Sequence, residues 1–269
     1  MDVIQGVVLG LIQGITELLP VSSSGHLILT PFFLGWKDQG LLFDMALNTA
    51  TLLALMIYFR QDVINLIGGW FASFSVGLKD NPHGRMAWSI GLATIPAGVA
   101  GIFLKGFVEG LARDPRMVGF TLIFYGLLLW LVDRRATLAK GFDLLTLRDA
   151  MIIGFAQALA LVPGTSRSGI TMTAALFLGF NRETAARFAF LLAIPIGVAV
   201  AILDTKELLH EQIPLAAWEE IGVAFLTAMF SALAVIHWLL GWLRRRNMTV
   251  FVVYRVLLGV VVFWLAFSR

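Results

Sequence analysis

An amide and a carboxylate lie one helical turn apart near the start of the chain, within apolar sequence. Gln13 and Glu17 are four residues apart, so on a helix their side chains share one face. An ionised carboxylate in hydrocarbon costs roughly 2.5–3.5 kcal/mol or more, so Glu17 is expected to face a cavity, a metal or a cation. The alternative is an interfacial carboxylate that water solvates. Ionisable residues inside membranes generally serve function, which favours the first interpretation.

A polar loop follows this pair directly. It contains three serines, a glycine and a histidine: Ser22, Ser23, Ser24, Gly25 and His26. Since a helix is expected to begin near His26, the loop can offer backbone N–H groups, hydroxyls and a helix N-terminus to an anion. Helix capping is the alternative role, because serine is a common N-cap residue. His26 is three residues after Ser23 and is spaced to accept its proton, as a base beside a nucleophile.

A second polar loop lies in the other half of the chain. There Ser166, Arg167 and Ser168 interrupt an apolar stretch. The guanidinium of Arg167 carries a fork of donors that suits phosphate. A structural ion pair between Arg167 and Glu17 is the competing interpretation. Together the two loops predict a site for a phosphorylated ligand, and they do not separate hydrolysis from transport.

Other polar residues lie inside predicted spans. Asp44, Asn48 and Thr51 line one helical face, where they either extend a polar cavity or hydrogen-bond between helices. Arg255, beside Tyr254 in the last apolar stretch, is buried enough to need a partner. The sequence does not identify that partner.

The elements that hold these residues are predicted to be membrane helices. Of the 269 residues, 59% are hydrophobic and 14% are charged, and the mean hydropathy is +0.87. Soluble domains carry about 45–50% apolar and about 25% charged residues, so the composition indicates an integral membrane protein. The basic residues lie in short clusters between apolar stretches, which indicates orientation in a bilayer and no nucleic-acid partner. The chain has no cysteine, which excludes disulfides and thiolate catalysis.

Six stretches approach the roughly 20 apolar residues that a spanning helix needs. They are residues 41–60, 86–104, 117–135, 187–203, 218–242 and 250–267. Two further stretches, 2–35 and 149–180, are interrupted by the polar loops, so each is predicted to be a re-entrant helix hairpin. Residues 62–76 are more typical of an interfacial helix than of a seventh span.

The two interrupted stretches are related in sequence. A shift of 144 residues pairs Gly10 with Gly154, Gln13 with Gln157, Ser22 with Ser166, Ser24 with Ser168 and Gly25 with Gly169. Residues 1–140 and 141–269 are therefore predicted to be two repeats within a single membrane domain, each a re-entrant hairpin plus three transmembrane helices. An odd number of crossings inverts the second repeat relative to the first. The predicted fold class is an all-α integral membrane protein with an inverted-topology repeat.

Basic residues favour the cytoplasmic side and so predict an orientation. They place residues 60–85, 134–148, 182–187 and 244–246 inside. The loop 204–220 has one lysine and five acidic residues and is predicted to lie outside, as are both termini. The two polar loops would then meet near the midplane. The basic loop 105–116, on the outer side, argues against this scheme.

Both polar loops resemble signatures of the bacterial undecaprenyl pyrophosphate phosphatase family, which is also known for bacitracin resistance. Residues 13–26 read QGITELLPVSSSGH and residues 163–171 read PGTSRSGIT, and residues 254–259, YRVLLG, are also family-like. The resemblance runs over nearly the whole length. The chain departs from the family pattern at Gln13, where many members have Glu, and at Asn48, where Gln is expected.

The resemblance implies an enzyme that removes the terminal phosphate of the C55 isoprenoid pyrophosphate on the outer, periplasmic face of the bacterial inner (plasma) membrane, recycling the lipid carrier of peptidoglycan synthesis. It implies a divalent metal, Mg²⁺ or Ca²⁺, bound by Glu17 with Gln13 as a further ligand. Glu17 would bind the metal or assist acid–base steps, Ser23 would be the nucleophile, His26 its partner and Arg167 the phosphate clamp. The implied substrate-binding residues are Ser22, Ser24, Gly25, Thr165, Ser166, Ser168 and Thr171.

Two functions of another class stay open at this point. A transporter or flippase of a polyprenyl phosphate lipid would use the same loops, since broken helices and inverted repeats are transporter architecture. An ion channel lined by the two loops is the third interpretation. Phosphate release in detergent separates hydrolysis from both. The expected partners are the isoprenoid pyrophosphate and membrane lipids, with no nucleic acid, and a homodimer stays open.

Overall fold

The computed structural model describes residues 3–37, 39–112, 115–208 and 215–267. All regular elements in these ranges are helical, which confirms the prediction of an all-α protein. In chain order the helices are α1 (Val3–Thr16), α2 (Ser23–Leu34), α3 (Leu41–Tyr58), α4 (Arg60–Val76), α5 (Pro82–Ala112), α6 (Pro115–Arg135), α7 (Leu147–Ala158), α8 (Arg167–Phe177), α9 (Arg182–Leu208), α10 (Leu215–Leu243) and α11 (Thr249–Phe267). Short 3₁₀ turns lie on either side of α7, at Phe142–Leu144 and Leu159–Leu161.

Six helices in the described ranges are long and apolar enough to cross a membrane. Their candidate spans are Leu41–Tyr58, Pro82–Leu104, Arg116–Arg135, Arg182–Lys206, Trp218–Leu243 and Thr249–Ala266. These belong to α3, α5, α6, α9, α10 and α11, and each coincides with a predicted stretch. At a rise of about 1.5 Å per residue, they match the ~30 Å hydrocarbon core of a bilayer. The chain is therefore a multi-pass membrane protein.

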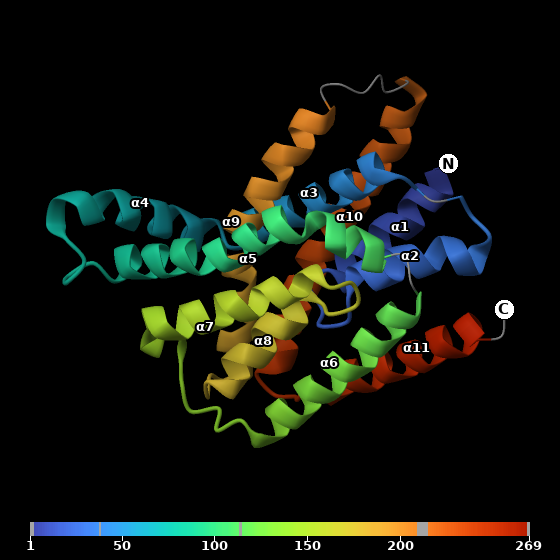
Figure 1. The fold of residues 1–269 in the computed structure, drawn as a ribbon. Helices are drawn as coiled ribbons and strands as arrows, with labels where there is room; N and C mark the ends of the chain where they lie inside the picture. The colour runs from blue at the N-terminus through green and yellow to red at the C-terminus, as the bar shows by residue number, and fades with distance from the viewer. Residues whose placement is uncertain (1–2, 38, 113–114, 209–214, 268–269) are drawn as a thin grey trace.

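The two interrupted stretches form helix hairpins, α1–α2 and α7–α8. With 14 and 12 residues, α1 and α7 are too short to span a bilayer alone. The chain turns at residues 17–22 in the first hairpin and at residues 159–166 in the second. Both turns lie at the centre of the molecule (Figure 1), where hydrogen bonds join them.

Small residues allow the hairpins to pack closely against the spans. The first helix, α1, lies along α10, and α7 lies along α5. A Cβ on Gly10 would lie 2.5 Å from the carbonyl oxygen of Ala224, and one on Gly154 would overlap the carbonyl of Ala93. Such contacts are typical of helix packing in membranes, where small residues let backbones approach. They explain part of the chain's high glycine content, 26 residues.

Helix α4 corresponds to residues 62–76, which were predicted to form an interfacial helix. It continues from the end of α3 and forms a hairpin with α5 that projects from the rest of the fold (Figure 1). Asn81 closes this hairpin, because its side chain donates to the carbonyl of Gly69 at 2.7 Å and accepts from the N–H of Gly84 at 2.8 Å. None of the described α4 side chains is buried. A position at the membrane surface stays a prediction.

Ion pairs join the ends of helices on the side predicted to be cytoplasmic. Arg182 donates to Asp133 at 2.6 Å, and the N–H of Met248 donates to the same carboxylate at 3.1 Å. Arg187 donates to Asp62 at 2.6 Å. These basic residues therefore join neighbouring helices through ion pairs. Residues 113–114 and 209–214, in the two loops predicted to lie outside, are beyond the described ranges.

Candidate active site

Glu17 connects the turns of the two hairpins. It follows α1, and its carboxylate accepts hydrogen bonds from Arg167 Nη2 at 2.5 Å and from the Ser23 hydroxyl. Arg167 and Ser23 are the first residues of α8 and α2. The Ser168 hydroxyl adds bonds to the carbonyl oxygens of Leu19 at 2.9 Å and Glu17 at 3.2 Å. Three helix ends from two distant parts of the chain therefore meet at one carboxylate.

Burial distinguishes the two interpretations of Glu17. Its side chain is 11% exposed, whereas that of Arg167 is 32% exposed and lines a cavity. Glu17 therefore faces a cation inside the protein and not bulk water. The ion pair that competed with a phosphate clamp is formed, but the cavity-facing part of Arg167 is still available to a ligand.

Gln13 and Asn48 extend this polar group. Gln13, buried on α1, donates from its amide nitrogen to Asn48 Oδ1 at 2.8 Å and to Glu17 Oε2 at 3.4 Å. Asn48, on α3, therefore does both things expected of it: it lines the cavity and bonds between helices. The amide oxygen of Gln13 is buried and has no hydrogen-bond partner among the described residues.

The available donors decide whether a metal fits here. Within the described residues, no group of three or more His, Cys, Asp or Glu side chains could hold an ion. Glu17 nevertheless offers a carboxylate and Gln13 an unpartnered amide oxygen. Mg²⁺ and Ca²⁺ prefer oxygen ligands, and Mg²⁺ is commonly held by one or two carboxylates together with substrate phosphates. The residues therefore fit a cation shared with a phosphate ligand, and they do not form a complete protein cage.

The two serine loops share one backbone geometry. Ser22 and Ser166 have φ angles of 73° and 72°, in the left-handed region that favours glycine. The hydroxyl of Ser22 lies 3.3 Å from that of Ser24, and the hydroxyl of Ser166 lies 3.2 Å from that of Ser168. Ser166 caps α8 by accepting from the N–H of Gly169 at 3.1 Å, whereas Ser22 makes no side-chain cap bond to α2. Capping therefore accounts for one loop and not for the other.

The contact between Ser23 and His26 that their spacing suggested is not formed. His26 Nδ1 lies 2.7 Å from the carbonyl oxygen of Ser22, and His26 Nε2 lies 2.6 Å from the Tyr254 hydroxyl. Ser23 donates to Glu17 instead. The Ser22 carbonyl oxygen is therefore shared between the His26 ring and the His26 backbone nitrogen, which lies 3.4 Å from it.

The remaining residues expected to bind substrate lie in different surroundings. Ser168 lines the cavity and Ser24 is exposed. Thr171 is buried and donates to a main-chain carbonyl of its own helix at 2.8 Å, so its hydroxyl serves the backbone. The Thr165 hydroxyl is buried without a partner among the described residues, and Gly25 is buried within the first turn.

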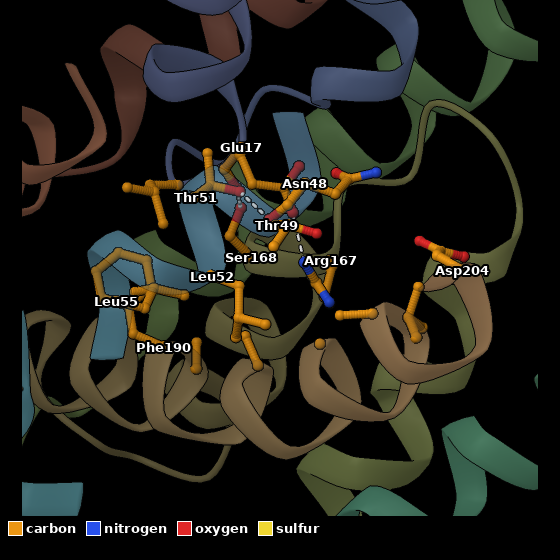
Figure 2. Close-up of a pocket in the computed structure, with 16 residues that line it drawn as sticks. Glu17, Asn48, Thr49, Thr51, Leu52, Leu55, Arg167, Ser168, Phe190 and Asp204 are labelled. Carbon is orange, nitrogen blue, oxygen red and sulfur yellow. Dashed lines mark hydrogen bonds and ion pairs between the residues drawn. The ribbon is translucent and has the colours of Figure 1, made fainter. Parts of the chain in front are cut away.

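A cavity of about 170 Å³ lies between α3, α9 and the two turns (Figure 2). Its polar end carries Glu17, Asn48 and Arg167, and Asp204 lies at the far rim. Its apolar walls are formed by Leu52, Leu55, Ala189, Phe190, Ala193, Gly197, Val200 and Ala201. Val200, one turn before Asp204 on α9, is 42% exposed, so the rim near Asp204 reaches the outer surface of the helix pair.

The wall that α9 contributes to this cavity was not predicted from the sequence. Ala189, Ala193, Gly197 and Ala201 recur every four residues and therefore share one face of the helix. Small residues at this spacing are typical of close helix contacts in membranes. Here they line the cavity beside α3. At Gly197 the two helices lie close together, because a Cβ there would lie 3.0 Å from Leu52 Cδ1. The four-residue spacing was the signal that could have identified the wall.

Arg255 has the partners that the sequence could not identify. Its side chain is fully buried and donates to five main-chain carbonyls at 3.0–3.4 Å, those of Pro20, Thr121, Leu122, Gly164 and Thr165. Two of these belong to α6, and the other three belong to the two hairpin turns. Any residue supplies a carbonyl oxygen, so no side-chain pattern predicts this set.

The fold and the site define a class: a multi-pass helical membrane protein with a charged, hydroxyl-rich site between the turns of two helix hairpins. The chain belongs to the family described as bacitracin resistance protein BacA, which it matches over residues 6–261. This confirms the resemblance seen in the two loops.

Curated relatives match over nearly the whole length. A protein named undecaprenyl-diphosphatase from Magnetococcus marinus is 50% identical over 266 residues, which is 98% of each chain. Proteins of the same name from Saccharophagus degradans and Hahella chejuensis are 48% and 49% identical, over 96% and 94% of each chain.

Proposed function

We propose that this chain is an undecaprenyl-diphosphatase, which hydrolyses undecaprenyl diphosphate to undecaprenyl phosphate and inorganic phosphate and so recycles the lipid carrier of peptidoglycan. The observation that carries the proposal is the group of Glu17, Arg167 and Ser23 at the polar end of a cavity with apolar walls. A diphosphate on a hydrocarbon chain has the same division between charged and apolar parts. The names of the relatives, at about 50% identity, support the assignment.

Arg167 receives the terminal phosphate. A guanidinium presents two parallel donors to phosphate oxygens, and Arg167 is the more exposed member of its ion pair. The incoming phosphate takes over the hydrogen bond that the Arg167 guanidinium donates to Glu17. The Glu17 carboxylate is then free to act as a base, so the ion pair and the phosphate clamp are two stages of one cycle.

Ser23 is the nucleophile and Glu17 is its base. The Ser23 hydroxyl already donates to the Glu17 carboxylate, so proton transfer needs no rearrangement. As the bond from Ser23 Oγ to the terminal phosphorus forms, the proton passes to Glu17. The bond from that phosphorus to the bridging oxygen breaks, and its electron pair leaves with undecaprenyl phosphate. Water then displaces Ser23 from phosphorus, the proton on Glu17 returns to Ser23 Oγ, and inorganic phosphate leaves.

Glu17 and Gln13 would hold a divalent cation, Mg²⁺ or Ca²⁺, through the carboxylate and the unpartnered amide oxygen. When bound, such a cation neutralises charge on the diphosphate. The N-termini of α2 and α8 add backbone N–H groups with the same preference for anions.

The apolar end of the cavity receives the first isoprene units of the substrate. Small residues on α9 form the wall beside α3, and the exposed Val200, one turn before Asp204 at the rim, marks where the isoprenoid chain leaves the cavity. Burying apolar carbons is worth about 0.8 kcal/mol per CH₂ group, so this contact favours a prenyl substrate over free diphosphate.

Residues 1–140 and 141–269 are an inverted repeat in this proposal. Ser22 and Ser166, which the shift of 144 residues pairs, share the same positive φ, and both lie near a serine hydroxyl two residues later. These matches support a duplication, and three spans after each hairpin require the second half to be inverted. The site then opens to the outer, periplasmic side of the bacterial inner membrane, with the basic clusters inside.

Phosphate release from purified protein in detergent tests the function. With undecaprenyl diphosphate and Mg²⁺, we expect release from the wild type and a loss on the order of 10²-fold or more in Ser23→Ala. Ser75→Ala, at an exposed serine of α4, is the matched control and should release phosphate normally. Detergent leaves no second compartment, so a transporter or flippase would show no release. That result, or normal release by Ser23→Ala, would contradict the proposal.

A further inference from the structure

The last helix brings two adjacent polar residues, Tyr254 and Arg255, against the hairpin turns. Neither residue takes part in the chemistry described above. Tyr254 contacts His26 of the first hairpin, and Arg255 contacts main-chain carbonyls of both turns. The inference that follows rests on the proposed function, because it concerns the geometry of that same site.

Tyr254 and His26 form a close pair. Their rings stack with centroids 5.5 Å apart and an angle of 6° between the planes. The Tyr254 hydroxyl lies 2.6 Å from His26 Nε2. A stacked ring and a hydrogen bond together restrict both the tilt and the rotation of the imidazole.

The partners of His26 select one tautomer. Nδ1 lies 2.7 Å from the Ser22 carbonyl oxygen, which can only accept, so Nδ1 carries a proton. In the neutral ring Nε2 is then an acceptor, and the Tyr254 hydroxyl donates to it. Both nitrogens are occupied, so His26 is held in place beside Ser23 and is not its base.

The bond from His26 supports a strained position. Ser22 has a φ of 73°, a conformation that residues with a side chain rarely adopt and that persists where neighbours enforce it. The Ser22 side chain does not cap α2. His26 Nδ1 instead holds the main-chain carbonyl of Ser22, at 2.7 Å. Two residues earlier, Arg255 donates to the Pro20 carbonyl at 3.2 Å. The turn before Ser23 is therefore held from α11 at two points.

We propose that Tyr254 is a positioning residue: through His26 its hydroxyl fixes the turn at Ser22 and so aims Ser23 at the phosphate. Arg255 holds the carbonyls of the same turn and of the second turn, which keeps Glu17 and Arg167 in register with Ser23. Helix α11 thus sets the distance between nucleophile and clamp without touching the substrate.

Tyr254→Phe tests the proposal, because it removes one hydroxyl and keeps the ring. We expect kcat to fall on the order of 10-fold or more, since small misplacements of a reacting group are costly, while KM stays within about twofold. Tyr58→Phe is the matched control: it removes the hydroxyl of another tyrosine–histidine pair, with His237 at 3.4 Å, and should leave both parameters unchanged. Equal kcat in the two variants, or a loss confined to KM, would overturn the proposal.

A second measurement does not depend on turnover. The chain has four histidines, so ¹⁵N-histidine labelling gives few signals, and those of His26 are the ones absent from His26→Gln. The wild type should show His26 protonated on Nδ1, and Tyr254→Phe should shift the Nε2 signal while Tyr58→Phe leaves it in place. A wild type protonated on Nε2, or unchanged signals in Tyr254→Phe, would overturn the inference. A wild type that releases no phosphate would instead overturn the proposed function. The histidine signals would then still test whether Tyr254 positions His26.

Discussion

At the scale of single residues, Arg167 offers the sharpest test of phosphate recognition. Arg167→Lys keeps the positive charge and removes the fork of two parallel donors. We expect kcat/KM to fall on the order of 10²-fold or more, with part of the loss in kcat, if the guanidinium also stabilises charge in the transition state. Phosphate-release kinetics measure this, with Arg187→Lys as control, since Arg187 pairs with Asp62 outside the site. An Arg167→Lys enzyme with wild-type kinetics would refute the clamp.

A purely structural ion pair makes a different forecast for the same residue. Arg167→Ala would then lower the melting temperature in detergent, because it leaves the Glu17 carboxylate, 11% exposed, without its cation. Combining Arg167→Ala with Glu17→Gln would recover much of that loss. Thermal unfolding of the single and double variants measures the coupling directly. If Arg167 is instead a phosphate clamp, both single variants and the double variant lose activity, whether or not their melting temperatures change.

Glu17 carries the second prediction at this scale. Glu17→Gln keeps the shape of the side chain and removes both the proton acceptor for Ser23 and the carboxylate that would hold a metal. We expect a folded protein whose metal-dependent phosphate release is lower on the order of 10²-fold or more. Gln13→Glu is the companion variant and should keep its activity, because an oxygen stays at the position that has no protein partner. Near-normal turnover in Glu17→Gln would remove this carboxylate from the mechanism.

The sequence predicted some of these contacts for a clear reason. Charged residues are rare within apolar stretches, so the sequence allowed an ion pair between Glu17 and Arg167, 150 residues apart, as the alternative to a phosphate clamp. The direction of the His26 ring was not predictable, because it depends on a backbone carbonyl and on Tyr254, 228 residues away. The same holds for Arg255, whose acceptors are all main-chain atoms. Side-chain types can indicate which charged residues pair. Main-chain acceptors cannot be predicted in this way, because every residue has a carbonyl oxygen.

At the scale of helices, apolar length was a sufficient guide to the spans. The six predicted stretches match α3, α5, α6, α9, α10 and α11 because a bilayer imposes a nearly fixed length. The hairpins were recognisable because proline and glycine interrupt their apolar runs. The space between α3 and α9 was not predicted, since it depends on which helices become neighbours.

Gly197→Leu tests the role of that space. A Cβ at Gly197 already approaches Leu52, so a leucine should fill the apolar end of the cavity. We expect KM for undecaprenyl diphosphate to rise about 10-fold, with a smaller effect on a short, water-soluble prenyl diphosphate. Kinetics with both substrates measure this. Gly241→Leu is the control, because nothing lies within 4 Å of a Cβ at that position on α10. Equal effects on both substrates would place the prenyl chain elsewhere.

At the scale of the whole molecule, the repeat and the charge distribution lead to one orientation. In the proposed inverted repeat, two hairpins with matching turns are each followed by three candidate spans, so the two halves would run in opposite directions through the membrane. The basic clusters then lie on one side, where Arg182 and Arg187 also bind acidic partners on neighbouring helices. The repeat is proposed because polar residues that recur at a fixed separation within apolar sequence are uncommon. The basic loop 105–116 argues against this orientation, because it would lie on the outer side.

Cysteine labelling decides the orientation, and this chain suits it because it contains no cysteine. Lys37 and Lys206 are exposed near segments predicted outside, and Lys79 and Asn247 are exposed near segments predicted inside. In intact cells, a membrane-impermeant thiol reagent should label Lys37→Cys and Lys206→Cys. Lys79→Cys and Asn247→Cys should react only after the membrane is permeabilised, which also controls for their reactivity. Labelling of Lys37→Cys and Lys79→Cys from the same side would exclude a span between them. If Lys37→Cys is labelled and Lys206→Cys is protected, the two halves are not inverted relative to each other. The proposal that a substrate reaches both hairpin turns from the outer face would then also be wrong.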